Sequence, residues 1–196
     1  MTAESKTNSP LRPQDWVDQH GDYLFRYAML RLNNDTQLAE DLVQETFLAA
    51  IKAIATYQGN SAERTWLVSI LKNKIIDHYR RKKSNLFEQS DFQNEEFINQ
   101  GEPAGAWKVE FAPQDWGDTP EKAFEQQEFT FIFRKCLAAL PQNLAAVFAL
   151  RELDGLDTDT ICKELSISAS NVWVILHRAR TSLRRCLELN WFEASQ

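Results

Sequence analysis

The apolar residues of this chain fall into two clusters, residues 24–71 and 129–189, and the stretch between them reads differently. The length of 196 residues suits one large domain or two small ones, and a hydrophobic content of 43% is ordinary for globular proteins. The period-two alternation typical of strands is scarce, whereas stretches rich in Ala, Leu, Glu, Gln and Arg are long. We therefore predict an all-α fold, with two small helical domains joined by an acidic linker.

Composition also indicates where the domains begin and end. The predicted order is a flexible N-terminus, a first helical domain, a linker and a second helical domain, at residues 1–12, 13–83, 84–122 and 123–192. Prolines and the glycine-containing piece GEPAG mark the linker. It also carries Trp107, Phe111 and Trp116, which a disordered acidic segment seldom contains. We therefore expect the linker to dock against another surface.

The charge of the chain is unevenly distributed. The net charge is -6, but residues 72–83 hold six basic residues against Asp77, which gives +5. Residues 84–128 hold two lysines against eleven acidic residues, which gives -9. Because phosphate neutralisation by Lys and Arg supplies most non-specific affinity for DNA, this pattern indicates weak DNA binding alone and help from a larger partner. The alternative is that the basic run is a solvated helix end.

The three cysteines, Cys136, Cys162 and Cys186, are widely spaced and form no C-x-x-C pair. Each lies within a helical apolar pattern. We therefore predict three separate buried thiols, with neither a metal site nor a disulfide framework.

Nothing in the sequence indicates catalysis or a membrane segment. His20, His78 and His177 are scattered, and no nucleophile–base pair or phosphate-binding glycine loop accompanies them. We expect no cofactor and no enzymatic activity. The first residues lack the apolar core of a signal peptide, and no run approaches the ~20 apolar residues of a membrane span. We expect a cytoplasmic chain without membrane insertion.

The first domain is predicted to contain three helices. The first begins near Pro13 or Asp15 and ends at the turn-forming residues 33–35, and the second covers residues 36–56. Helical spacing predicts that the second helix buries one stripe, formed by Ala39, Val43, Ala50 and Ile54 with Phe47 and Ile51 alongside. Its other face gathers Asp41, Gln44, Glu45, Leu48 and Lys52, and a solvated polar face is the usual explanation.

The third helix is predicted to follow a loop at residues 57–64 and to be capped by Thr65. Its inward residues are Trp66, Leu67, Ile70, Leu71 and Ile75. Its more exposed residues are Asn73, Asp77, Arg80 and Arg81.

The second domain ends in the pattern of a helix-turn-helix. A helix over about 121–140 precedes one that Pro141 starts and that ends near Gly155. A short helix capped by Asp157 or Thr158 and a long basic helix capped by Ser168 then follow. The long helix is predicted to bury Val172, Leu176, Ala179, Leu183 and Leu187. Its outward residues are Ser170, Val174, His177, Arg178, Thr181 and Arg185.

A helix-turn-helix inserts the first turns of its second helix into the major groove. Ser170, Asn171, Val174 and His177 are therefore placed to reach base edges, with Trp173 on the flank. The arginines of this helix, Arg178, Arg180, Arg184 and Arg185, are placed for phosphates. The alternative is a basic amphipathic helix that packs against a partner.

Three segments carry the most specific motifs of the chain: AEDLVQETFLAAIKA at 39–53, ERTWLVSILKNKIIDHYRRKK at 63–83 and GLDTDTICKELSISASNVWVILHRARTSLRR at 155–185. Together they resemble the extracytoplasmic-function sigma factors of bacterial RNA polymerase. The resemblance covers nearly all of both domains. It implies a sigma factor that binds core polymerase, directs it to specific promoters and promotes promoter melting. The alternative is a stand-alone helix-turn-helix transcriptional regulator with a sensing N-terminal domain.

The resemblance assigns roles to residues of the first domain. The face of Asp41, Gln44, Glu45 and Leu48 becomes a docking surface for the coiled coil of the largest polymerase subunit. The minus-ten element and the separated strand are read by Tyr57, Asn60, Trp66, Asn73, Asp77, Arg80 and Arg81. Unstacked bases need an aromatic face or polar pocket, and the backbone needs cations, which these side chains offer. Trp66 could equally belong to the core.

In the second domain the resemblance implies recognition of the minus-thirty-five element as duplex. The residues concerned are Ser170, Asn171, Trp173, Val174, His177, Arg178 and Arg180. Many relatives carry Lys, Ser and Arg where this chain has Trp173, Val174 and Ile175, so base reading is expected to rely more on van der Waals contact with thymine methyl groups. The resemblance also implies an anti-sigma factor as a partner. It further implies that the acidic linker threads toward the active-site channel of the polymerase.

Overall fold

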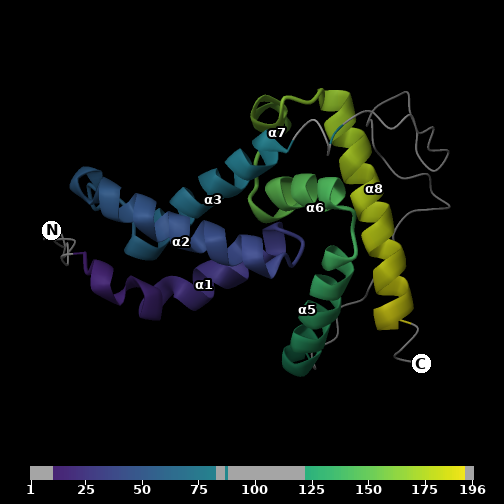
Figure 1. Cartoon of the computed structure of the whole chain (residues 1–196). Coiled ribbons are helices and arrows are strands. Elements are labelled where there is room, and N and C mark those ends of the chain that lie inside the picture. Colours follow the sequence, from purple (N-terminus) through teal and green to yellow (C-terminus); the bar gives the residue numbers. More distant parts are fainter. Residues whose placement is uncertain (1–10, 83–86, 88–121, 193–196) are drawn as a thin grey trace, which may run out of the picture. The chain divides into compact units, whose positions relative to one another are not determined.

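Figure 1 shows the computed structural model of the chain, which describes residues 11–82, 87 and 122–192. Every regular element within these ranges is helical, which confirms the predicted all-α fold. The chain divides between His78 and Tyr79 into two compact units. The predicted domain boundaries stay predictions. The N-terminal ten residues and Trp107, Phe111 and Trp116 of the linker lie outside the described residues.

The first unit is built on a helical hairpin. The short 3-10 helix η1 (Pro13–Asp15) leads into α1 (Trp16–Arg31), and α2 (Thr36–Ala53) follows after a tight turn. Asn33 and Asn34 have φ values of 56° and 59° in that turn, a left-handed conformation that Asn tolerates better than most residues. The Asp35 carboxylate accepts a hydrogen bond from the backbone N–H of Leu38 at 3.0 Å and so caps α2. The turn and both helices agree with the prediction.

The third helix of this unit begins earlier than predicted. After the 3-10 helix η2 (Ile54–Thr56), α3 runs over Glu63–Arg81. The backbone N–H of Trp66 donates to the carbonyl oxygen of Ala62 at 3.0 Å, so Ala62 holds the N-cap position. Thr65 is therefore inside the first turn, and the prediction that it caps the helix is wrong.

The core of the first unit is formed by one stripe from each helix. Its fully buried large side chains include Trp16, Leu24, Leu32, Leu67, Leu71 and Ile75. On α2 the predicted stripe is confirmed for Ala39, Val43 and Ala50, with Leu42 and Thr46 in addition. Thr46 is tolerated there because its hydroxyl donates to the carbonyl oxygen of Leu42 at 2.7 Å. Ile51, predicted to lie beside the core, is instead 51% exposed.

The second unit is centred on a short apolar helix. It contains α5 (Lys122–Ala138), α6 (Gln142–Phe148) with the π-helical turn η4 (Ala149–Leu153), α7 (Thr158–Leu165), α8 (Ala169–Leu187) and the π-helical turn η5 (Glu188–Phe192). All residues from Leu144 to Leu150 are buried. A helix that is apolar all round is surrounded by others, and α6 contacts α8. Figure 1 shows α6 between α5, α7 and α8 in this unit. Pro141 is the N-cap of α6, one residue before the predicted position.

The helix-turn-helix is formed by α7 and α8. Asp157 caps α7 by accepting from the backbone N–H of Thr160 at 2.7 Å and from its hydroxyl at 2.9 Å. These hydrogen bonds, the backbone one first, lower the pKa of Asp157 from its ordinary value. Ser166 ends α7 in the left-handed region, at φ 49°, and Ser168 caps α8 through the backbone N–H of Asn171. The predicted caps at Asp157 and Ser168 are confirmed.

The buried stripe of α8 is the predicted one, widened by two residues. Val172, Leu176, Ala179, Leu183 and Leu187 are all at most 5% exposed. Ile175 is buried beside them. Thr181, predicted to point outward, is 8% exposed, so that prediction is wrong.

The cysteines depart most from the prediction. Cys136 on α5 and Cys186 on α8 form a disulfide, with their Cα atoms 5.7 Å apart. The expectation of three separate thiols is therefore wrong for this pair, and holds only for Cys162, which is free and half-buried. The two partners are 50 residues apart in sequence, and only the packing of α5 on α8 brings them together.

Candidate functional site

The first candidate surface is the exposed face of α2. Asp41, Gln44, Glu45 and Leu48 are all exposed, on the side of the helix opposite its buried stripe. Leu48 is 59% exposed and Ile51, one turn further on, is 51% exposed. Two large apolar side chains left in solvent next to one another are more consistent with a docking surface than with a solvated polar face.

One member of this surface is paired within the first unit. The Lys74 ammonium of α3 lies 2.9 Å from a carboxylate oxygen of Glu45. Lys74 is only 23% exposed, whereas Glu45 is 52% exposed. Sequence reasoning missed Lys74, because its role depends on α3 lying beside α2. The ion pair orients Glu45 while leaving half of its side chain open to a partner.

The second candidate surface starts at an aromatic cluster beside the loop between η2 and α3. The ring centroids of Tyr57 and Trp66 lie 4.8 Å apart, and those of Trp66 and Trp16 lie 6.0 Å apart at a steep angle. Phe47 stacks on Trp16 at 6.4 Å. Trp16 is fully buried while Trp66 and Tyr57 are half-buried. Trp66 is thus an edge of the core that also presents part of its ring.

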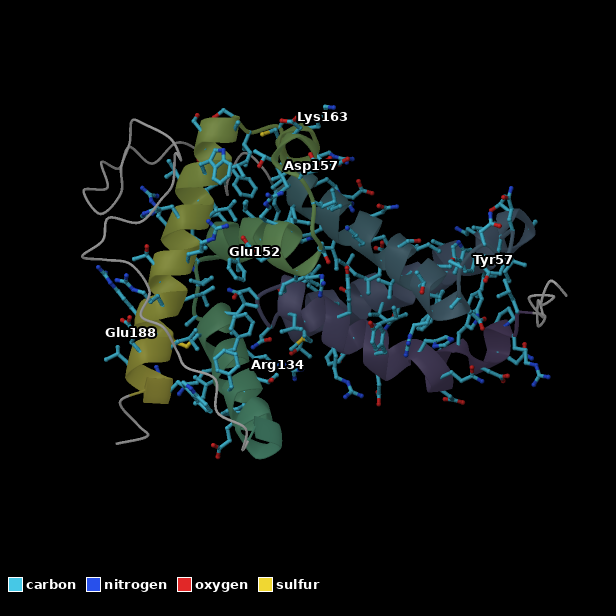
Figure 2. The ribbon with its side chains drawn as sticks, turned by 180° about the vertical axis from the view of Figure 1, so that it is seen from behind. Tyr57, Arg134, Glu152, Asp157, Lys163 and Glu188 are labelled. Carbon is cyan, nitrogen blue, oxygen red and sulfur yellow. A yellow bond between two sulfur atoms is a disulfide. The ribbon has the colours of Figure 1, made fainter. Side chains whose placement is uncertain are left out.

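The loop next to this cluster is held by local hydrogen bonds. The Tyr57 hydroxyl donates to the carbonyl oxygen of Ser61, and the exposed Asn60 amide donates to Gln58 at 3.1 Å. Figure 2 labels Tyr57 at this loop. At the start of α3, the Glu63 carboxylate accepts from the indole N–H of Trp16 and lies 3.9 Å from His20. The loop therefore has a defined conformation anchored to α1.

The residues assigned to the minus-ten element do not form one pocket. Tyr57, Asn60 and Trp66 lie at the loop and the first turn of α3, whereas Asn73 and Asp77 lie further along that helix. Arg80 and Arg81 are exposed in its last turn. At 1.5 Å per residue, Trp66 and Arg81 are about 22 Å apart along the axis. The set is a track along one helix, which suits an extended strand better than a single base.

The third candidate surface is the first half of α8. Ser170 is exposed, and its hydroxyl lies 2.9 Å from that of the capping Ser168. Asn171 and His177 are half-buried. Trp173 is 44% exposed and Val174 38% exposed, so the most prominent side chains of these turns are apolar.

The arginines of α8 are less available than predicted. Arg178 is half-buried, and that burial lowers its pKa from the ordinary value, although an arginine keeps its charge in proteins. Arg180 is in an ion pair with Glu152 of η4, which Figure 2 labels. Arg184 lies 3.5 Å from Glu188. Sequence reasoning missed Glu152, since nothing in the local pattern links η4 to α8.

Neither a metal site nor a membrane span is found in the part of the chain that the structure describes. No group of three His, Cys, Asp or Glu side chains there could hold a metal ion. Among the same residues, no helix combines the length and the apolar character needed to span a bilayer.

Comparison with known proteins gives the family. Residues 16–85 match sigma-70 region 2, and residues 130–183 match sigma-70 region 4. The chain is 39% identical over 165 residues to a protein of Haemophilus influenzae named "Probable RNA polymerase sigma factor", with 84% of each chain covered. It is 28% identical over 173 residues to the ECF RNA polymerase sigma factor SigW of Bacillus subtilis, covering 88% of this chain and 87% of that protein. Among solved structures it is similar to the sigma factor RpoE of Bartonella quintana in complex with the anti-sigma factor NepR. That likeness has a TM-score of 0.42 and 18% identity, and covers 90% of this chain and 97% of the other.

The region 2 match decides between the two functions that the sequence left open. A stand-alone regulator would have a sensing domain where residues 16–85 match region 2. The chain therefore belongs to the sigma-70 family as an extracytoplasmic-function sigma factor, a subunit that is not itself an enzyme and directs RNA polymerase to specific promoters at initiation.

Proposed function

We propose that each of the three surfaces described above binds a different partner or promoter element. The α2 surface of Asp41, Gln44, Glu45 and Leu48 binds the coiled coil of the largest subunit of core polymerase. The α3 track reads the minus-ten element and holds the separated strand, so that the chain promotes promoter melting. The first half of α8 reads the minus-thirty-five element. We further propose an anti-sigma factor as a partner and the cytoplasm as the location.

The observation that carries the docking proposal is the exposure of Leu48 and Ile51. Both side chains are half or more exposed, so a partner that covers them stabilises the complex. The stabilisation is about 25 cal/mol per Å² of apolar surface buried. Asp41 and Gln44 beside them supply polar contacts, which fix orientation more than affinity. An acidic face of this kind repels DNA phosphates, so a protein is the better partner.

Purified core polymerase tests this surface directly. Asp41→Ala and Gln44→Ala are expected to weaken core binding, and the matched controls are Asp18→Ala and Gln19→Ala, which change exposed residues of α1. All four proteins are expected to keep their helical circular dichroism. If the α1 controls weaken binding as much as the α2 changes, the α2 surface is not the docking site.

The track on α3 supports strand binding through the order of its side chains. The half-buried rings of Tyr57 and Trp66 offer stacking faces near one end. The exposed Arg81 offers a cation near the other end, whereas the neighbouring Arg80 already pairs with Glu164. Stacking of a base on an aromatic ring contributes about 1–3 kcal/mol, and cations follow the phosphates. Tyr57→Ala is expected to reduce permanganate reactivity of thymines at the promoter start region, with Tyr23→Ala on α1 as an aromatic control. Unchanged reactivity in Tyr57→Ala would remove this residue from strand binding.

The first half of α8 supports a reading of thymine methyl groups. Trp173 and Val174 have no polar atom that matches a base edge, apart from the indole N–H, but they offer apolar surface. In the major groove, the 5-methyl group of thymine is the apolar feature that distinguishes it from the other bases.

Removal of thymine methyl groups from the DNA tests this reading. Duplexes in which deoxyuridine replaces thymidine in the minus-thirty-five element keep their base pairs and lose only methyl groups. Burial of one methyl contributes about 0.8 kcal/mol, so binding is expected to fall about fourfold for each contacted methyl. The same replacement in the spacer is the control. In Trp173→Ala or Val174→Ala the sensitivity should disappear, and if it persists in both variants these residues do not contact methyl groups.

The partner and the location have their own tests. An anti-sigma factor should co-purify with the chain from the native cell and prevent its binding to core polymerase. Cell fractionation should recover the chain with the polymerase. Recovery in the periplasmic fraction would contradict the proposed location.

A further inference from the structure

The disulfide of the second unit raises a question about its chemical environment. Cys136 is 1% exposed near the end of α5, and Cys186 is half-buried near the end of α8. Disulfides persist in oxidising compartments, whereas thiols stay reduced in the cytosol unless the pair is transient, catalytic or redox-sensing. A sigma factor meets its polymerase where thiols are reduced, a step that rests on the proposed location. A permanent structural link is therefore not expected for this pair.

We propose that Cys136 and Cys186 form a site of reversible oxidation, with a peroxide as the oxidant and a dithiol as the reductant. The fold holds the two Cα atoms 5.7 Å apart, within the usual range for a disulfide. The link is therefore compatible with the packing of α5 on α8. Only three cysteines are present in the chain, and Cys162 lies apart on α7 as a free thiol.

The difference in exposure assigns the order of events. The half-buried Cys186 thiol meets peroxide first, and it becomes a sulfenic acid as one peroxide oxygen is transferred and water leaves. The Cys136 thiol then attacks the Cys186 sulfur, the S–S bond forms and a second water leaves. In total two thiols lose two electrons and two protons, and one peroxide is reduced to water. A dithiol reverses the reaction by thiol–disulfide exchange and is itself oxidised to a cyclic disulfide.

A neighbouring amide supports the assignment of Cys186 as the reactive sulfur. The side-chain nitrogen of Asn190 lies 3.6 Å from the Cys186 sulfur and donates to the Cys186 carbonyl oxygen at 2.8 Å. The hydrogen bond to the carbonyl oxygen fixes the amide in place, so that its N–H dipole points at the sulfur. A donor in this position stabilises a thiolate, which is the form that attacks peroxide and that leaves on reduction. Asn190 is a positioning residue in this scheme.

The link also has a mechanical consequence for the second unit. It ties α5 to the same helix, α8, whose first half reads DNA. Besides the disulfide, the contacts between α5 and η5 include the edge-on contact of Phe129 with Trp191, at 5.6 Å between ring centroids. Oxidation closes a loop that spans a sequence separation of 50 and so restricts the unfolded chain. The oxidised unit is therefore more resistant to unfolding than the reduced one.

The test uses the full chain in a Cys162→Ala background, in which only two thiols remain. After peroxide treatment and removal of excess oxidant, both thiols should become unreactive toward a maleimide, with a mass loss of two hydrogen atoms and no dimer on a non-reducing gel. Treatment with dithiothreitol should restore both thiols. Two reactive thiols after peroxide, or a covalent dimer in place of the internal link, would overturn the proposal.

Stability and rate complete the test. The oxidised chain should melt higher than the reduced chain, by on the order of 10 °C in the transition of the second unit. Cys186→Ala should melt like the reduced chain under both conditions, and an equal melting temperature of the two forms of the parent would contradict the mechanical role.

Asn190→Ala should slow peroxide oxidation several-fold while leaving the reduced melting temperature unchanged, and an unchanged rate would remove Asn190 from the scheme. None of these measurements uses polymerase or DNA, so they can fail or succeed independently of the proposed promoter recognition.

Discussion

The exposed surfaces of α2 and α8 both combine apolar and charged side chains, but they combine them differently. On α2 the apolar Leu48 and Ile51 follow the polar Asp41 and Gln44, and the acidic members carry negative charge. On α8 the apolar Trp173 and Val174 come first, and arginines follow. Each helix buries a stripe of similar character against its own unit. Burial alone therefore does not distinguish the two helices.

The sign of the charge beside the apolar residues indicates which ligand each surface suits. An acidic helix face repels the phosphates of DNA, so its exposed aliphatic groups are more consistent with a protein partner. Arginines that follow an apolar turn suit a duplex, in which base edges lie deep in the groove and phosphates line its rims. The following predictions test this comparison.

The largest effect is expected for Leu48→Asp. A buried anchor at a protein interface contributes about 2 kcal/mol, so core binding should weaken about 30-fold in a fluorescence titration. The fold should be unaffected because Leu48 is 59% exposed. Val17→Asp is the matched control, since Val17 on α1 is 63% exposed. Similar losses in both variants would show that the effect is not specific to α2.

A smaller effect is expected for Trp173→Ala. Binding to a duplex with the minus-thirty-five element should weaken roughly tenfold, because the indole offers a large apolar contact area at little entropic cost. Core binding should stay as in the parent protein. Phe131→Ala, which changes a residue of α5 that is 70% exposed, is the control. Equal loss of core binding and DNA binding in Trp173→Ala would indicate damage to the fold.

The arginines of α8 should differ in their salt dependence. Arg178→Ala should reduce the slope of log affinity against log salt by about 0.9, the value for one phosphate contact. Arg180→Ala should change it less, because Glu152 already pairs with Arg180. Glu152→Gln should make the slope steeper by freeing Arg180.

The control for the salt dependence is Arg134→Ala, a change on α5 at an exposed residue that Figure 2 labels. The slope should be the same in this variant as in the parent. Equal slopes for Arg178→Ala and the parent would remove Arg178 from the phosphate contacts.

The smallest effect is expected for Lys74→Ala. Its ion pair with the half-exposed Glu45 should contribute less than about 1 kcal/mol to the free energy of unfolding, as measured by urea denaturation. A loss well above that value would mean that Lys74 supports the first unit through its packed methylene groups rather than its charge.

The sequence was sufficient for features that depend on local order along the chain. The buried stripes of α2 and α8 follow from helical spacing, and the caps at Asp157 and Ser168 are residue types whose side chains accept from a nearby backbone N–H. The exposure of Asp41, Gln44 and Leu48 follows from the same spacing. These features need no knowledge of which helix lies beside which.

The sequence was insufficient for contacts between helices. The partners Cys136 and Cys186, Glu45 and Lys74, and Glu152 and Arg180 are separated by 50, 29 and 28 residues. The misplaced start of α3 has another cause, since Ala62 at the N-cap offers no side-chain acceptor to signal it. Ile51 and Thr181 lie at the edges of their stripes, where a small rotation of the helix decides burial.

The most direct test of the central claim is run-off transcription on a genomic library with purified core polymerase, with and without this chain. Discrete new start sites should appear only when the chain is present. They should weaken with Leu48→Asp and remain with Val17→Asp. Transcripts that start at the same sites without the chain, or new starts that do not depend on Leu48, would contradict the claim that the α2 surface brings the polymerase to its promoters.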